Sequence, residues 1–308
     1  MKLKHLKNKT VFIIGGPTAS GKSKLAMDLA QQFRGERVNG DSMQVYRNFK
    51  ILTSQPSSQD MQKIKHHLYN YVFTNSNFNA VEWLKNAIYI IEGIISRNKT
   101  PIVVGGSGLY LEFLLKGVNK LPNISFKTKK KAQEILNKMR KKEVFDLVKK
   151  IDPTYALKIN IADNFRITKV LEIFLETNKN ITYFHSKKRN LHDFNFYKIL
   201  NLPNKKKVNQ NIHNRLDLMI HEGLINEIRE HRSLVQNCNI EKAIGYKEII
   251  SYLDGIISLD EAKKLILKNT KNFAKRQYTW FKNRFYEDIK LESNFESSLI
   301  VETFLKIN

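Results

Sequence analysis

The sequence predicts an α/β fold in which a parallel sheet is flanked by helices, and three neighbouring features indicate it. Residues 16–23 match the phosphate-loop pattern G-x-x-x-x-G-K-[ST] at every position. Residues 10–14 form an apolar run of strand length, and residues 24–33 place Leu25, Leu29 and Phe33 on one helical face. This motif requires the order strand, glycine-rich turn, helix, so we favour a P-loop NTPase-like fold over an ordinary glycine-rich turn.

Each residue type in the motif suits the binding of a di- or triphosphate. The glycines let successive backbone N–H groups turn inward at the positive end of the following helix. Lys22 adds a point charge, and the Ser23 hydroxyl is placed to ligand a phosphate-bound Mg²⁺. The predicted phosphate site comprises Gly16, Pro17, Thr18, Ala19, Ser20, Gly21, Lys22 and Ser23.

The composition is that of a folded protein with a large positive charge. The 308 residues are 42% hydrophobic, and 53 Lys+Arg against 29 Asp+Glu give a net charge of +24. This excess favours a polyanionic partner, most commonly nucleic acid. An AT-rich genome, whose codons favour Lys, Asn and Ile, is the alternative explanation, so the placement of the charges must decide.

The cysteine content and the lengths of the apolar runs argue against a secreted or membrane-spanning protein. The single cysteine, Cys238, argues against an intramolecular disulfide and a thiolate-based metal site. The apolar run after the lysine-rich first nine residues is too short for a signal segment, and no window approaches the ~20 apolar residues of a membrane span. We expect a cytoplasmic protein without a membrane partner, and take a monomer as the default.

Asp41 follows the second predicted strand, residues 36–39. The carboxyl ends of parallel strands face the ligand crevice, so Asp41 is expected beside the phosphate loop. It can ligate Mg²⁺ through water, act as a general base, or be a surface residue of a turn. Residues 50–80 are polar and irregular, and the adjacent His66 and His67 point to different sides, which argues against a shared metal.

The next segments continue the alternation of helix and strand. Residues 81–95 have the apolar spacing of a helix, residues 101–104 form a buried strand, and residues 109–115 form another helix. The glycine-rich turn over residues 105–108 indicates either close approach of the backbone to a ligand or tight packing.

From about residue 120 the chain becomes basic, with helical periodicity. Ten lysines and arginines between residues 127 and 150 accompany three acidic residues. We predict that residues 1–119 form the first part of the α/β core, residues 120–200 a basic helical insertion, and residues 201–308 helices that complete the core. A solvated, lysine-rich face is the alternative interpretation of the insertion.

The last predicted helix, residues 260–285, is the best evidence for a nucleic-acid partner. At 100° per residue, its core side carries Ala262, Ile266, Phe273 and Trp280. The other side carries a lysine stripe within about 60°, formed by Lys264, Lys268, Lys271, Lys275 and Lys282. An AT-rich genome explains many lysines but not their alignment, so we predict contact with a phosphate backbone.

Together these segments resemble the bacterial tRNA dimethylallyltransferases, also called tRNA isopentenyltransferases. Outside the phosphate loop each match is weak alone, but the ordered set is specific and spans nearly the whole chain. The matching segments are residues 16–23, Asp41–Ser42 with Tyr46, residues 105–110, Asp163 with Arg166 and Leu171–Glu172, Gly223–Leu224, residues 243–247 and residues 274–281.

The resemblance implies transfer of a dimethylallyl group from dimethylallyl diphosphate to N6 of the adenosine 3′ of the anticodon in tRNA, with release of diphosphate. The phosphate loop, Lys22, Arg215 and Mg²⁺ on Ser23 would hold the leaving diphosphate. Asp41 would be the general base for the adenine amine, and the adenine must leave its stack to reach the pocket.

The resemblance also implies a tRNA path in which the basic insertion grips the anticodon stem and Ser107 lies near the reacting base. The residues that it assigns to tRNA binding are Asp41, Ser42, Met43, Gln44, Ser107, Lys129, Phe165, Arg166, Ile167, Thr168, Lys169, Lys242, Ala243, Ile244, Gly245, Tyr246, Lys247, Lys275, Arg276, Gln277, Tyr278, Thr279, Trp280, Phe281 and Lys282.

Two positions depart from the family pattern. Asn211 stands where an arginine usually helps to clamp the diphosphate, and an amide supplies neither the charge nor the bidentate fork. Arg215, one turn later, or Lys207 are the candidates to replace it. Phe165 stands where a Gln is common, so a stacking contact would take the place of a hydrogen bond.

Three alternatives fit parts of the sequence. An ATP-dependent small-molecule kinase would use the phosphate loop but leave the basic surface without a purpose. A prenyltransferase of free adenine nucleotides would not need the helical insertion. A non-catalytic tRNA-binding protein would bind tRNA without turnover.

Overall fold

The computed structural model describes residues 9–187 and 192–292 of the chain. Residues 1–8, with the first three N-terminal lysines, lie outside the described residues. The described part contains one six-stranded parallel sheet in the order β3-β2-β4-β1-β5-β6. Its strands are β1 Thr10–Gly15, β2 Gly35–Asn39, β3 His66–His67, β4 Thr100–Gly105, β5 Asn195–Asn201 and β6 Ile289–Leu291.

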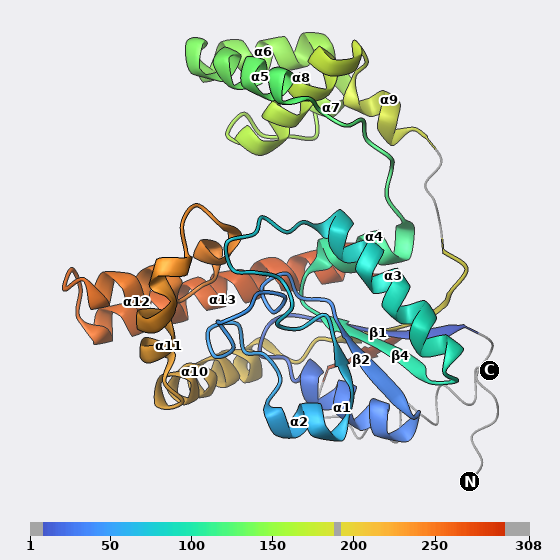
Figure 1. Ribbon diagram of the computed structural model, residues 1–308, viewed down its shortest axis with the longest axis vertical. Helices are drawn as coiled ribbons and strands as arrows, with labels where there is room; N and C mark the ends of the chain where they lie inside the picture. Colours follow the sequence, from blue (N-terminus) through green and yellow to red (C-terminus); the bar gives the residue numbers. More distant parts are fainter. Residues whose placement is uncertain (1–8, 188–191, 293–308) are drawn as a thin grey trace. The chain divides into compact units, whose positions relative to one another are not determined.

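The sheet is central because three of its strands, β1, β2 and β4, are buried along their whole length. All six residues of β1 are buried, with β4 on one side and β5 on the other. Helix α1 (Lys22–Gln32) and helix α3 (Ala80–Ser96) cover opposite faces (Figure 1). On the α1 face, Phe12 packs against Phe33 and Tyr197. Burying both faces of a parallel sheet in this way is the rule for α/β proteins.

Helix α3 packs on the sheet as predicted, but its buried face is rotated from the one that the apolar spacing indicated. Of the predicted positions Val81, Leu84, Ile88, Ile91 and Ile95, Leu84 and Ile91 are buried, Ile88 and Ile95 are half-buried, and Val81 is exposed. The buried residues are Trp83, Leu84, Ala87, Ile91 and Ile94. Trp83 Nε1–H donates a hydrogen bond of 2.7 Å to the carbonyl oxygen of Asn39, and burying this indole determines which face of the helix packs.

The other core helices extend the part of the fold that carries the site. They are α2 (Ser58–Lys63), α4 (Gly108–Lys116), α10 (Lys205–His221), α11 (Leu224–His231), α12 (Tyr246–Leu253) and α13 (Leu259–Arg284), with 3-10 turns at Arg232–Leu234 and Asn239–Lys242. The predicted long C-terminal helix is confirmed as α13, which begins with a capping box between Ser258 and Glu261. Within the described residues, no helix has the length and apolar character needed to cross a membrane.

A second compact unit comprises residues 116–192, whereas the sequence analysis placed the helical insertion at residues 120–200. Its helices are α5 (Phe126–Lys138), α6 (Lys141–Ile151), α7 (Pro153–Ala156), α8 (Asn164–Thr177) and α9 (Ile181–His185). The unit has its own apolar core, and buried Asp152 accepts hydrogen bonds from the backbone of Tyr155 and Thr182. Strand β5 lies in the range 120–200 that the sequence assigned to the insertion, yet it pairs with β1 of the core.

Gly105 brings the ends of β4 and β2 into contact. A Cβ atom at Gly105 would lie 2.0 Å from the carbonyl oxygen of Gly40, and the Gly40 N–H donates to the carbonyl of Val104 at 2.8 Å. The second glycine-rich turn therefore includes a close backbone–backbone packing contact. This contact positions Asp41, the residue after Gly40.

We expect Gly105→Ala to lower the free energy of unfolding by about 1–3 kcal/mol, because the added methyl group overlaps backbone that cannot move aside. Gly93→Ala is the matched control: in α3 a Cβ would meet only the Arg97 guanidinium at 3.5 Å. The control should raise stability by about 0.5–1 kcal/mol. Urea unfolding followed by circular dichroism measures both, and equal effects would contradict this account.

Candidate active site

The phosphate loop has a conformation that only its sequence permits. Gly16 has a φ of 151° and Gly21 a φ of 89°, both in the region that favours glycine. At Gly16 a Cβ atom would lie 2.2 Å from the carbonyl oxygen of Asn201, so no side chain fits. Helix α1 follows the loop, as the motif predicted, but begins at Lys22, two residues before the predicted range 24–33.

Side chains from three distant elements hold the loop in place. Gln277 of α13 accepts a hydrogen bond from the Thr18 N–H (2.8 Å) and donates one to the Gly106 carbonyl (2.9 Å). Asn201, at the end of β5, donates to the Ser20 carbonyl at 2.9 Å. From α10, Asn211 donates to the Ala19 carbonyl, and Arg215 donates to the Thr18 hydroxyl, both at 2.8 Å.

The cavity above the loop has three cationic side chains and one carboxylate among its lining residues. It has a volume of about 200 Å³ and is lined by residues 18–23 together with Arg37, Arg215 and Asp41. Lys22 Nζ donates to the carbonyl oxygen of Pro17 and lies 3.4 Å from the Ser20 hydroxyl. Burial lowers the pKa of Lys22 to about 8; the Arg215 charge acts in the same direction and the Asp41 charge opposes it. Burial also lowers the pKa of Arg215.

Asp41 lies where the charged cavity meets a second, more apolar one. Its Oδ1 accepts a hydrogen bond from the Met43 N–H at 2.9 Å, and its own N–H donates to Asn39 Oδ1 at 2.8 Å, which fixes the turn after β2. The second cavity has a volume of about 300 Å³ and also includes Thr18 and Arg215. Its apolar lining comes from Leu52, Ile212, Leu216, Met219, Ile266, Leu267 and Phe273.

The residues present suit a phosphate-bound magnesium ion. Ser23 and Asp41 line the same cavity and offer a hydroxyl and a carboxylate oxygen, the hard donors that Mg²⁺ prefers. Across residues 9–187 and 192–292 there is no cluster of three or more His, Cys, Asp or Glu side chains that could hold a metal. This donor set fits an ion that takes most of its ligands from phosphate and water.

The turn after β4 meets the turn after β2. The Ser107 hydroxyl accepts a hydrogen bond from the Ser42 N–H at 2.9 Å and donates to the Ser42 hydroxyl at 3.1 Å. Gln44 donates to the carbonyls of Thr53 and Ser54. Ser107 and the predicted segment 41–44 therefore form one wall beside the phosphate loop.

The residues 275–282 that were predicted to bind tRNA lie on different sides of α13. Gln277 and Phe281 are buried, and Trp280 packs over Gly108. Arg276 borders the apolar cavity together with residues 242–244. Of the junction 242–247, Lys242 and Lys247 are exposed, whereas Ala243, Gly245 and Tyr246 are buried.

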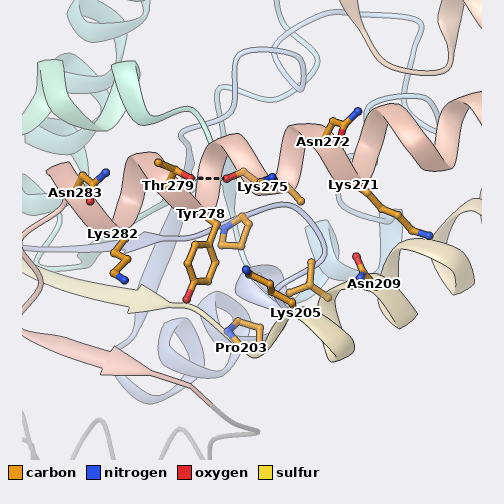
Figure 2. A pocket seen from close by; sticks show the side chains of 13 residues that line it. Pro203, Lys205, Asn209, Lys271, Asn272, Lys275, Tyr278, Thr279, Lys282 and Asn283 are labelled. Carbon is orange, nitrogen blue, oxygen red and sulfur yellow. Dashed lines mark hydrogen bonds between the residues drawn. The ribbon is translucent and has the colours of Figure 1, made fainter.

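The opposite side of α13 lines a third cavity of about 610 Å³, drawn in Figure 2. Its lining includes Lys271, Lys275, Tyr278, Thr279 and Lys282 of α13 and Lys205 of α10, with no acidic side chain among its lining residues. The predicted stripe is partly exposed: Lys264, Lys268, Lys275 and Lys282 face solvent, and Lys271 is half-buried. Phe273 and Trp280, predicted on the core side, are only half-buried.

The other predicted tRNA residues belong to the second unit. Lys129, Phe165 and Arg166 are exposed there, and Phe165 is 81% exposed. Ile167 is buried in the core of the unit. Thr168 donates to the Asn164 carbonyl at 2.7 Å, and Lys169 pairs with Glu172 at 3.1 Å, both within α8.

Arg37, a β2 residue that lines the phosphate-loop cavity, was not among the predicted site residues. It is 2% exposed. No motif marks a single arginine within a short strand, so only the paired strands reveal that its side chain reaches the site.

The fold and the site together define an α/β phosphate-loop protein with a ligand crevice at the carboxyl ends of its parallel strands. The family model for IPP transferase matches residues 44–284. The tRNA dimethylallyltransferase of Rickettsia canadensis is 39% identical over 305 residues, which cover 97% of this chain and 94% of the relative. The chain belongs to the IPP transferase family, which confirms the resemblance found in the sequence.

Solved structures agree with this assignment and confirm the fold class. A full-length tRNA isopentenylpyrophosphate transferase from Bacillus halodurans superposes with a TM-score of 0.70 at 30% identity, covering 98% of this chain and 96% of the other. A eukaryotic dimethylallyltransferase acting on tRNA superposes with a TM-score of 0.77 at 28% identity, covering 89% and 70% respectively.

If Lys22 binds diphosphate as predicted, its lowered pKa should make the affinity for pyrophosphate depend on pH. Above about pH 8 the free protein loses the Lys22 charge, whereas bound diphosphate favours the protonated form. The Kd for pyrophosphate should therefore rise by up to about tenfold per pH unit above pH 8. Calorimetric titration of the wild type and of Lys22→Arg, which stays charged, isolates this effect. Parallel pH profiles would contradict it.

Proposed function

We propose that the protein transfers a dimethylallyl group from dimethylallyl diphosphate to N6 of the adenosine 3′ of the anticodon in tRNA and releases diphosphate. One observation carries the proposal: a small cavity over a phosphate loop, with a surplus of positive charge, adjoins at Asp41 a second cavity to which apolar side chains contribute half of the lining residues. A ligand with a diphosphate head and a short hydrocarbon tail has the same division of polarity. Membership of the IPP transferase family supports the same reaction.

The phosphate loop would bind the diphosphate as a leaving group. Negative charge grows on the bridging oxygen as the allylic C–O bond breaks, and fixed donors aimed at that charge lower the barrier. Thr18, Lys22 and Arg215 supply such donors. The hydrogen bond that Asn211 donates to Ala19 and the one that Gln277 accepts from Thr18 hold the loop ready. Mg²⁺ held through Ser23 would further neutralise the diphosphate when bound.

Asp41 would accept the proton of the adenine amine. The amine is a weak nucleophile because its lone pair is delocalised into the ring, so removing a proton as the new C–N bond forms assists attack. The hydrogen bond from the Met43 N–H engages only Oδ1. Asp41 borders both cavities, between the diphosphate and the space for the hydrocarbon and the base.

The tRNA anticodon stem-loop would reach this site with the adenine extruded from its stack. Exposed Lys242 and Arg276 line the apolar cavity, and exposed Lys247 lines a neighbouring cavity that shares both residues, so all three can contact the RNA backbone. The basic second unit would contact the anticodon stem through exposed residues such as Lys129 and Arg166. A monomer suffices for this arrangement.

The first experiment is to incubate the purified protein with dimethylallyl diphosphate, Mg²⁺ and unmodified tRNA, and to analyse the nucleosides by mass spectrometry. We expect N6-dimethylallyl adenosine that depends on all three additions. ATP hydrolysis or phosphotransfer without that product would support the kinase alternative, and tRNA binding without any turnover the non-catalytic one.

Asp41→Asn should reduce the single-turnover rate by about 10²–10⁴-fold, because the amide keeps the acceptor for the Met43 N–H but cannot take a proton. Affinity for tRNA, measured by filter binding, should stay within about twofold, as expected for a change that leaves the backbone contacts intact. A rate close to that of the wild type would assign Asp41 to the turn alone.

Charge reversal on α13 tests the predicted phosphate contacts. Lys268→Glu and Lys275→Glu should each weaken tRNA binding and reduce the slope of log Kd against log salt by about one. Lys85→Glu, the same change at an exposed position of α3, serves as the control. Slopes equal to that of the control would remove this face of α13 from the tRNA path.

A further inference from the structure

Arg37 is a buried cation in β2, the second strand from one edge of the sheet. It lies in register with Ile102 of β4 and His66 of β3, and is only 2% exposed. A buried charge is strongly destabilising unless a partner offsets the lost hydration. The partners of this guanidinium therefore decide whether its role is structural.

The guanidinium of Arg37 has few interactions with other protein groups. Its Nη2 donates a long hydrogen bond of 3.3 Å to the Tyr69 hydroxyl, and its guanidinium carbon lies 5.9 Å from the centre of that ring. Its Nε has no hydrogen-bond partner. Within the described residues no carboxylate lies within ion-pair distance of the guanidinium.

The neighbouring carboxylate, that of Glu36, already has other partners. Glu36 is paired with His67, Arg97 and Lys99, and these contacts lower its pKa to about 2 although its burial acts in the opposite direction. Adjacent residues of a strand point to opposite faces of the sheet, so Glu36 cannot turn to Arg37. The positive charge of Arg37 remains uncompensated.

The side chain of Arg37 borders the cavity of the phosphate loop. Lys22, Ser23, Asp41, Tyr69 and Arg215 line the same space. Three cations against one carboxylate leave a surplus of positive charge there. Asn211 adds none, since it is neutral and its amide is engaged with the Ala19 carbonyl.

We propose that Arg37 is a third cationic ligand of the diphosphate, donating from β2 while Lys22 donates from the loop and Arg215 from α10. The inference rests on the proposed function, whose substrate carries this diphosphate. A phosphate oxygen supplies the anionic acceptor that the protein does not, and the hydrogen bonds are of the charge-assisted kind. Arg37 is thus a binding residue whose partner arrives with the substrate.

This assignment makes two predictions of opposite sign for Arg37→Met, which removes the charge and keeps a long apolar side chain. The Kd for inorganic pyrophosphate in the presence of Mg²⁺ should rise by roughly 10- to 100-fold, as expected when a hydrogen bond between charged groups is lost. The Tm of the ligand-free protein should stay the same or rise, because an unpaired buried charge has been removed. A structural arginine would show the reverse: a lower Tm and an unchanged Kd.

Arg47→Met is the matched control, because Arg47 also stacks on an aromatic ring, that of Phe73 at 4.4 Å, but lies outside the phosphate-loop cavity. It should leave the Kd for pyrophosphate unchanged. Arg37→Lys provides a second variant, and its Kd should lie between those of the wild type and Arg37→Met, since it keeps the charge without the fork.

Isothermal titration calorimetry and thermal unfolding test the role of Arg37. Dimethylallyl transfer is assayed in parallel. An Arg37→Met protein that binds pyrophosphate like the wild type, or fails to fold, overturns the inference. If the wild type transfers dimethylallyl normally in that case, the proposed function stands without it. A weakened Kd in a protein whose wild type transfers nothing supports the Arg37 site and rejects the proposed function. A wild type that binds no pyrophosphate overturns both.

Discussion

The hydrogen bonds of one buried amide connect most of the site. Gln277 bridges the Thr18 N–H of the phosphate loop and the Gly106 carbonyl of the second glycine-rich turn, and it is only 6% exposed. A buried amide with one end unpaired is costly, so this bridge fixes both turns relative to α13. Because α13 is a continuous helix, fixing Gln277 also determines where Arg276 and Lys275 point.

The same dependence explains why the site needs so much of the chain. The carbonyls of Ala19 and Ser20 are bound by side chains of α10 and β5, which lie about 180 to 190 residues later in the sequence. The phosphate loop therefore takes its conformation only when the sheet and the C-terminal helices are assembled around it. Pre-organised donors need no rearrangement as charge develops on a leaving group, which is the condition for electrostatic catalysis.

The sequence predicted those parts of the fold whose physical cause is local. Residues 10–33 carry strand, turn and helix signals in one window, and the periodicity of α13 spans 26 residues. Strands β3, β5 and β6 were not predicted, because they are short or rich in polar residues and are stabilised by pairing with distant strands. The family resemblance assigned residues 275–282 together to tRNA binding, but only the folded structure shows that their side chains lie on different sides of α13.

The charge of +24 predicts a polyanionic partner but does not by itself locate the chemistry. Exposed lysines act over a Debye length and are screened by salt, so their number governs encounter with RNA more than binding of a small diphosphate. Buried cations are screened much less. Glu36 shows that this fold can neutralise a buried charge with three partners, and Arg37, one residue later, receives no carboxylate among the described residues. The two neighbouring buried charges therefore serve different purposes. The charge of Glu36 is paired within the fold, whereas the charge of Arg37, beside the phosphate loop, is left for an anion of the ligand.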